Sequence, residues 1–248
     1  IPRLRAGDVL NLRDGMYFES GLEVAVAGKA GQPIVIRSAP GERAVVDGGY
    51  REIRRGPNAH WEPVDPALGL YRSVKEYPDK VHGYMKIDGE TRRLITYGTL
   101  DDLRAVNEFY VEAGGTYVGH GLHWNPEDRR IYVRLVPSAL QRSLGHRDPP
   151  ALDPRQTRLQ LFSDGVLLRF DASAQYVQLE GLDLVHQANA LEFESGAHHI
   201  EVRDAELRAG RSHVVVRGGA HDLLFDGLEI DGAVPHWITW QDVKVETD

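Results

Sequence analysis

A 23-residue repeat near the C-terminal end is the feature that most constrains the fold. Residues 174–179, 197–202 and 220–225 superimpose at this spacing, and the match continues through 181–184, 204–207 and 227–230. A period in the low twenties, built from short alternating strands, is typical of a solenoid in which each repeat stacks on the next. Leucine-rich repeats have a similar length but need a different leucine frame and usually a helix, so we expect a solenoid of strands.

Each repeat holds three short strands, which in the first copy lie near residues 177–179, 182–184 and 191–193. Apolar and polar residues alternate along them, so each strand should bury one face. Glycine or aspartate stands at the bends between strands, as turns require. The pattern predicts an all-β parallel β-helix with three strands per coil and coils of about 23 residues.

The N-terminal residues add a resemblance to a known family. The segments AGDVLNLRDGMYFESG (residues 6–21) and GKAGQPIVIRSAPGERAVVDGG (residues 28–49) read as strands separated by tight turns. They resemble the first coils of the alginate lyase and chondroitinase B family of polysaccharide lyases, within the pectate-lyase-like superfamily, and related bacterial β-helix glycosidases begin similarly. The resemblance implies a right-handed β-helix and an enzyme acting on a polysaccharide. The family's catalytic lysine and arginine cannot be matched to positions in this sequence.

Three regions follow from these patterns. We expect β-helix coils over 1–53, a β-rich inserted subdomain with a linker over 54–160, and further coils over 161–248. Within the insertion, residues 125–128 predict a turn between two strands, and a short helix is expected near 99–106. The chain begins without methionine and ends without a capping segment, so we expect coils to continue beyond it.

Composition excludes several classes of function. The net charge of −8, with no basic stripe, argues against a nucleic-acid-binding protein. The absence of cysteine excludes disulfides and a catalytic thiol. No run of about 18 apolar residues is present, so no membrane-spanning segment is predicted. A protein that acts on polysaccharides is expected to be secreted or periplasmic.

The third strand of each coil carries the candidate catalytic residues, because it forms the usual substrate face of this fold. A polysaccharide lyase needs a cation to neutralise the uronate carboxylate, a base for the C5 proton and an acid for the leaving oxygen. Arg217 could neutralise the carboxylate, while His213 or His236 could act as base or acid. A glycosidase would instead need two carboxylates, for which Glu192 and Glu194 are the candidates.

The same face offers candidates for substrate binding. Arg169 precedes Glu192 by one 23-residue period, and Trp240 follows Arg217 by another. A guanidinium can bind a uronate carboxylate, and an indole ring can stack on a sugar. Both are therefore predicted to contact the polysaccharide.

Three acidic residues form a ladder, that is, a row of equivalent positions in successive repeats. Asp183, Glu206 and Glu229 recur at 23-residue spacing, which stacks three like charges on one face of the β-helix. Such a stack is destabilising unless it is solvated or bridged. Calcium prefers several carboxylate oxygens, so it is the one cofactor that this sequence suggests.

Two other functions remain open. A non-catalytic glycan-binding module could use Trp61, Trp124 or Trp240 as flat platforms for sugar rings. A uronate C5-epimerase would share the proton abstraction of a lyase and differ only afterwards. The leading hypothesis is a polysaccharide-degrading enzyme, acting by β-elimination on a uronate or by glycoside hydrolysis.

Overall fold

The computed structural model describes residues 3–54, 60–87, 90–108, 115–143 and 151–232. The chain divides into two compact units. Of the described residues, unit 1 comprises 3–54, 79–82 and 160–232, and unit 2 comprises those in 60–78 and 83–159. The described part is built mainly of strands, with three short helices, so the predicted all-β class with parallel sheets is confirmed.

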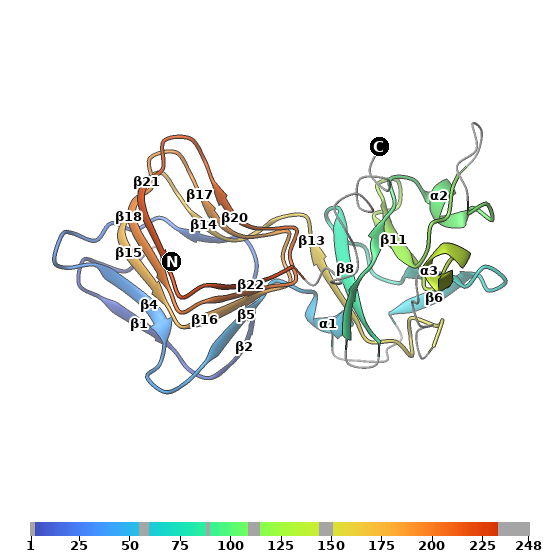
Figure 1. Ribbon diagram of the computed structural model, residues 1–248, viewed down its shortest axis with the longest axis horizontal. Coiled ribbons are helices and arrows are strands. Elements are labelled where there is room, and N and C mark those ends of the chain that lie inside the picture. The colour runs from blue at the N-terminus through green and yellow to red at the C-terminus, as the bar shows by residue number, and fades with distance from the viewer. Residues whose placement is uncertain (1–2, 55–59, 88–89, 109–114, 144–150, 233–248) are drawn as a thin grey trace. The chain divides into compact units, whose positions relative to one another are not determined.

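Three parallel sheets make up unit 1 (Figure 1). Sheet A contains β1 (Val9–Leu12), β4 (Ile34–Ser38), β15 (Gln175–Glu180), β18 (His198–Arg203) and β21 (His221–Asp226) in this order. Sheet B contains β2 (Gly15–Phe18), β5 (Ala44–Asp47), β16 (Leu182–Val185), β19 (Glu206–Arg208) and β22 (Glu229–Asp231). Sheet C contains β3 (Leu22–Val24), β14 (Val166–Phe170), β17 (Asn189–Phe193) and β20 (Ser212–Val216).

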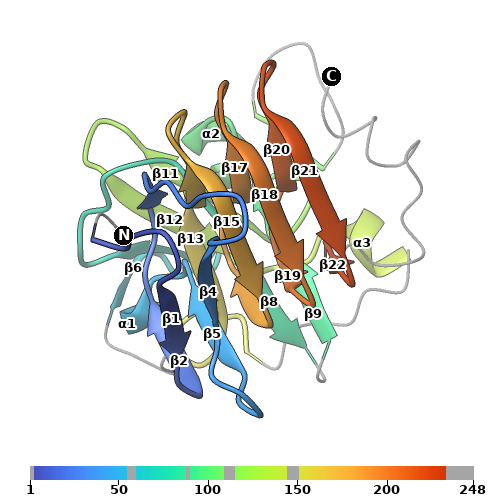
Figure 2. The same ribbon diagram turned by 90° about the vertical axis from the view of Figure 1, so that its left-hand side faces the viewer.

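The chain visits the three sheets in turn. The strands β15, β16 and β17 lie in sheets A, B and C, and β18, β19 and β20 repeat this path one layer further along. Figure 2 shows the successive layers of sheet A side by side. Each layer therefore contributes one strand to each sheet, as the three strands per repeat predicted.

The register of the sheets follows the 23-residue period. Val177 pairs with Ile200, which pairs with Leu223, and the same spacing relates Leu191 to Val214. The predicted stacking of equivalent positions is thus confirmed for sheets A, B and C. Any side chain in one repeat has its counterpart as a direct neighbour in the next.

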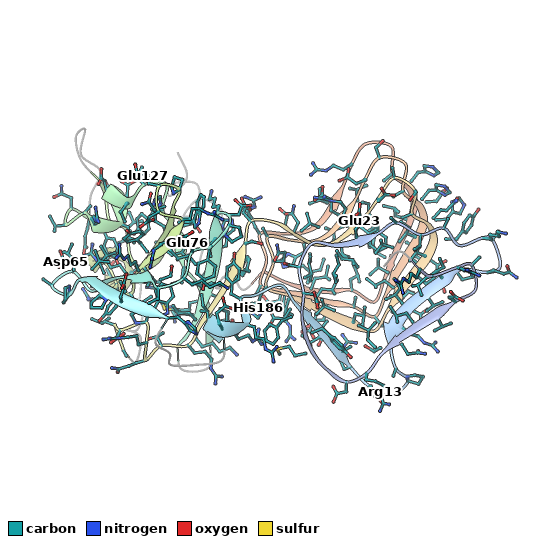
Figure 3. All side chains as sticks on the ribbon, turned by 180° about the vertical axis from the view of Figure 1, so that it is seen from behind. Arg13, Glu23, Asp65, Glu76, Glu127 and His186 are labelled. Carbon is teal, nitrogen blue, oxygen red and sulfur yellow. The ribbon has the colours of Figure 1, made fainter. Side chains whose placement is uncertain are left out.

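The inward-facing apolar residues of all three sheets form one core. Phe170 and Phe193 are fully buried and stack with their ring centroids 4.7 Å apart. Val177 and Ile200 from sheet A and Leu184 from sheet B belong to the same cluster. Side chains fill the space between the sheets (Figure 3), which explains why apolar residues alternate with polar ones along most of these strands.

The corner between sheets A and B uses a left-handed residue in each layer. Gly181, Asp204 and Gly227 occupy equivalent positions and have φ angles of 63°, 49° and 66°. Glycine adopts this conformation without strain, and aspartate tolerates it better than most residues. The repeated glycine or aspartate in the sequence therefore marks a true corner of the fold.

A long insertion interrupts the path between β5 and β14. It begins with α1 (Arg51–Arg54), and within unit 2 the strands β10 (Ile95–Thr96), β11 (Gly121–Asn125), β12 (Arg130–Arg134), β7 (Leu70–Ser73) and β6 (Trp61–Asp65) form one sheet. The other elements of the insertion are β8 (Val81–Ile87), β9 (Glu90–Arg93), β13 (Leu159–Ser163), α2 (Leu100–Arg104) and α3 (Ala139–Ser143). The predicted turn at 125–128 joins antiparallel β11 and β12, and the predicted helix is α2. No helix in the described ranges is long and apolar enough to span a membrane.

Candidate functional site

Two of the predicted site residues, Arg169 and Glu192, lie in one row across sheet C. Glu23, Arg169, Glu192 and Val215 are direct neighbours across β3, β14, β17 and β20. The 23-residue spacing had predicted that Arg169 and Glu192 are neighbours. Glu23 comes from before the insertion, so the repeat did not reveal it.

Glu192 and Arg217 form a close ion pair on this face. Nη2 and Nε of Arg217 lie 2.7 Å and 3.0 Å from Oε1 of Glu192. The side chain of Glu192 is only 3% exposed, whereas that of Arg217 is 53% exposed. Burial raises the pKa of Glu192. The hydrogen bond and charge of Arg217, together with the charge of Arg169, lower this pKa by more than burial raises it. The pKa of Glu192 therefore lies below its ordinary value. Glu192 is therefore a poor general acid.

Glu194 is paired in a similar but looser way. Its Oε1 lies 3.4 Å from Nε of Arg169, and both side chains are partly exposed. The structure thus brings four predicted residues together as two ion pairs, Glu192–Arg217 and Arg169–Glu194. Both guanidinium groups are about half exposed and can reach an anionic ligand.

His213 lies apart from these pairs. Its half-buried ring interacts with the backbone and charge of Asp231, and its Nε2 has no hydrogen-bond partner among the described residues. Burial lowers the pKa of His213 below the ordinary value of 6.5, and Asp231 opposes this only in part. His236 and Trp240 lie outside the described residues, so their predicted roles stay predictions.

The lowered pKa of His213 predicts an effect of pH on stability. The unfolded chain binds a proton at His213 near pH 6.5 more readily than the folded chain does. The contribution of the neutral His213 to the free energy of unfolding is therefore complete above this pH, and it is lost as the pH falls through the folded-state pKa. We expect His213→Gln to lose less stability than the parent protein between about pH 7 and pH 5. Urea denaturation across this range measures the difference, and parallel losses in both proteins would contradict the assignment.

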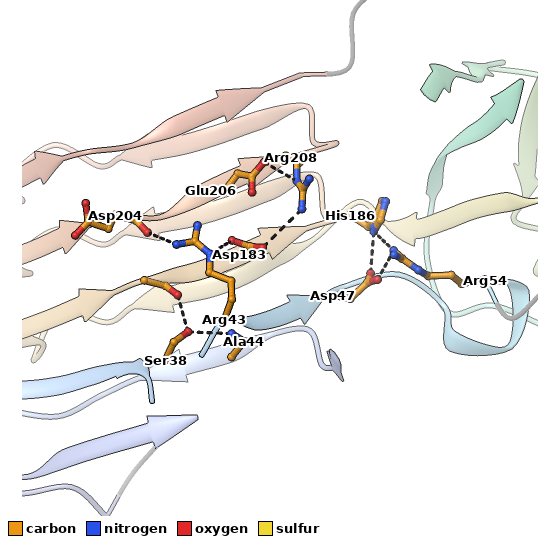
Figure 4. Close-up of polar contacts among 11 residues, drawn as sticks. Ser38, Arg43, Ala44, Asp47, Arg54, Asp183, His186, Asp204, Glu206 and Arg208 are labelled. Atoms are coloured by element: carbon orange, nitrogen blue, oxygen red, sulfur yellow. Dashed lines mark hydrogen bonds and ion pairs between the residues drawn. The ribbon is translucent and has the colours of Figure 1, made fainter. Parts of the chain in front are cut away.

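The acidic ladder of sheet B is interleaved with arginines (Figure 4). Asp183, Glu206 and Glu229 stack in register as predicted. Nε of Arg43 lies 2.6 Å from Asp183, and Nε of Arg208 lies 3.1 Å from Glu206. These arginines offset the like charges that a calcium ion was expected to bridge. Calcium binding at the ladder therefore stays a prediction, with the local ion pairs opposing it.

A buried polar group at the end of sheet B escaped the sequence analysis. Asp47 is fully buried and accepts hydrogen bonds from the backbone of Gly49 (2.8 Å) and from Arg54, while Nδ1 of His186 lies 3.0 Å from its Oδ1 (Figure 4). Asp47 and His186 stand 139 residues apart, so no local motif could have revealed their contact.

A second histidine–aspartate contact lies nearby in unit 1. Nε2 of His82 lies 3.1 Å from Oδ1 of Asp164, which also faces Arg211 at 3.3 Å. The ring of Phe162 lies between the two histidines, with centroids 6.1 Å from His82 and 6.4 Å from His186. Both histidines are at least 94% buried, so they do not present a reactive surface.

Sheet A carries an open groove of about 480 Å³. Its walls include Lys29 and Pro33 from the loop before β4 and Tyr176, His199, Glu201 and Asp222 from β15, β18 and β21. The sequence analysis missed this groove, although the 23-residue spacing of Tyr176, His199 and Asp222 could have indicated it. These residues are the second residues of β15, β18 and β21.

Two of the three tryptophans expected to serve as sugar platforms, Trp61 and Trp124, lie in the described residues, and each packs within the protein. Trp61 is only 4% exposed, so its predicted role as a platform is wrong. Trp124 is half-buried, and its indole N–H donates to the backbone oxygen of Tyr77 at 2.9 Å. A buried indole cannot offer its face to a ligand.

Comparison with known proteins gives a fold and no family. No family model matches the chain, and no curated protein sequence matches it. Among solved structures, a complex of XylC with xylose matches with a TM-score of 0.52 at 12% identity. The match covers 88% of this chain and 38% of that chain, so this chain spans well under half of XylC. At this identity the similarity concerns the fold alone.

Proposed function

We propose that this protein is carbohydrate-active and degrades a uronate-containing polysaccharide by β-elimination. The observation that carries the proposal is the pair of half-exposed arginines on sheet C, Arg169 and Arg217, each held by a carboxylate of the same sheet. Guanidinium groups fixed in this way are suited to bind the planar carboxylates of an acidic sugar.

Hydrolysis is the less favoured reaction at this face. A glycosidase needs one carboxylic acid that stays protonated near neutral pH. The pKa of Glu192 is lowered by Arg217, and Glu194 faces Arg169. The environment of Glu192 therefore disfavours its protonated form, and elimination fits this face better.

We further infer that unit 1 is a right-handed parallel β-helix of the pectate-lyase-like kind. The 23-residue register, the three parallel sheets visited in turn and the similarity to XylC support this inference. Xylose in the XylC complex is a sugar ligand, which agrees with a carbohydrate-active role for this chain. The proposed substrate would place the protein outside the cytoplasm, either secreted or in the periplasm.

The proposal is tested by incubation with a panel of uronate and neutral polysaccharides. Ultraviolet absorbance of unsaturated uronates should rise together with new reducing ends. Reducing ends without absorbance would overturn elimination and favour hydrolysis at Glu192 and Glu194. Silence in both measurements would contradict a degrading enzyme and favour an epimerase or a binding module.

A double variant separates substrate binding from stability. Glu192→Gln with Arg217→Gln removes both charges of the pair and so leaves no unpaired buried carboxylate. We expect kcat/KM on the active polysaccharide to fall about 100-fold or more, because a positioned cationic donor is lost. Arg203→Gln on sheet A breaks comparable ion pairs away from this face and should leave the rate unchanged. Equal rates in the double variant and the parent would refute the role of Arg217.

A non-catalytic glycan-binding function is the second candidate. The groove on sheet A favours it, because Tyr176, Gln178 and Glu201 combine an aromatic ring with hydrogen-bonding groups. Binding of a polysaccharide without its cleavage, reduced by Tyr176→Ala, would support this candidate.

A further inference from the structure

Two histidines and an aspartate converge on the outer surface of sheet A. His199 comes from β18, and His221 and Asp222 come from the neighbouring strand β21. One potential ligand atom from each lies within 4.8 Å of the other two, and all three residues are exposed. In the described part of the chain, this is the group of histidine and acidic residues whose geometry suits a metal ion.

The backbone explains why the side chains meet. Successive residues of a regular strand point to opposite faces of the sheet. His199 and Asp222 instead have φ angles of 52°, and the register passes from His198–His221 directly to Ile200–Leu223. The left-handed residue interrupts the alternation of each strand without changing the register, so it shares the outer surface with the residue before it. Nδ1 of His198 accordingly lies 2.8 Å from Nδ1 of His199.

We propose that His199, His221 and Asp222 bind a zinc ion or a similar divalent transition metal. Zinc takes nitrogen and oxygen ligands at about 2.0–2.1 Å in a tetrahedron, so neighbouring ligand atoms lie roughly 3.3 Å apart. Oδ2 of Asp222 is 2.9 Å from Nδ1 of His221 and 3.6 Å from Nδ1 of His199, on either side of that separation. Small rotations of exposed side chains suffice to reach tetrahedral geometry.

The surroundings favour this assignment. The ring of His198 stacks on that of His221 with an interplanar angle of 2° and a centroid distance of 5.1 Å, which restrains the ligand's orientation. Two imidazoles and one carboxylate suit zinc, whereas calcium and magnesium prefer oxygen ligands.

The position of the site gives the metal an opening to solvent. His199 and Asp222 also line the groove of about 480 Å³, together with Lys29 and Glu201. Three protein ligands leave a fourth tetrahedral position for water or an anionic ligand. The inference does not depend on the proposed polysaccharide chemistry, because it rests on a different sheet.

Metal binding by the full chain without a histidine tag tests the proposal. Isothermal titration with ZnCl₂ should show one site, and CoCl₂ should give the visible absorption of tetrahedral cobalt. We expect His199→Gln, His221→Gln and Asp222→Asn each to weaken zinc binding by at least about tenfold. All three residues are exposed, so the variants should keep the parent's circular dichroism spectrum.

A matched variant serves as the control. Asp226→Asn removes an exposed carboxylate that lies on the same strand as His221 and Asp222 and is not one of the three ligands. It should bind zinc as tightly as the parent protein. The proposal is overturned if the parent protein binds no zinc, or if the three ligand variants bind it as tightly as the parent does.

Discussion

Replacing Asp47 by alanine is expected to lower the free energy of unfolding by about 3–5 kcal/mol. The Asp47 side chain is fully buried. It forms an ion pair with Arg54, lies within hydrogen-bond distance of His186 and accepts a hydrogen bond from the backbone N–H of Gly49. Its loss would leave a largely buried guanidinium without its counter-charge and a backbone donor without its acceptor. Urea denaturation followed by circular dichroism measures the change.

Asp226→Ala is the control for this prediction. Asp226 also pairs with an arginine, Arg203, but its side chain is 63% exposed. Exposed pairs contribute little to stability, so this variant should stay close to the parent. If Asp47→Ala loses no more stability than Asp226→Ala, the buried group is not a stabilising feature of unit 1.

Phe193→Ala is the second substitution with a large expected effect, a loss of about 3–5 kcal/mol. Phe193 is fully buried between the stacked ring of Phe170 and the edge of Phe225, whose centroid lies 5.6 Å away. Removing the ring deletes apolar contacts and leaves a cavity that the rigid, hydrogen-bonded layers cannot close. The same denaturation experiment measures the loss.

Phe225→Ala provides the matched comparison. Phe225 has the same side chain and touches Phe193, but it is 38% exposed. It buries less apolar area, so its removal should cost clearly less stability. Equal losses from the two substitutions would show that the stacked pair is not the centre of the core.

The repeat made most of unit 1 predictable from the sequence. Because one period relates Val177, Ile200 and Leu223, it determined both which residues pair and which face each side chain occupies. The ladder of Glu180, Arg203 and Asp226 follows from the same period, and its Arg203–Asp226 ion pair is present at 3.0 Å. Local pattern also sufficed for the β11–β12 hairpin, since its strands adjoin in sequence.

Contacts across the insertion could not be predicted in this way. Leu22 pairs with Leu168, and Asp47 meets His186, although more than a hundred residues separate each pair. The period is broken there, so spacing carries no information on register. The left-handed residues His199 and Asp222 were missed for a different reason, because alternation assigns each residue to one face and cannot reveal a local reversal.

The two ends of the insertion lie against each other within unit 1. The backbone N–H of Tyr50 donates to the oxygen of Leu161 at 2.8 Å, and Gly49 bridges Phe162 in antiparallel fashion. The entropic cost of closing a loop rises only by about 0.6 kcal/mol for each doubling of its length, and here the closing contacts belong to unit 1 itself. Evolution could therefore lengthen, exchange or delete the segment between these residues while the pairing of strands in the three parallel sheets stays the same.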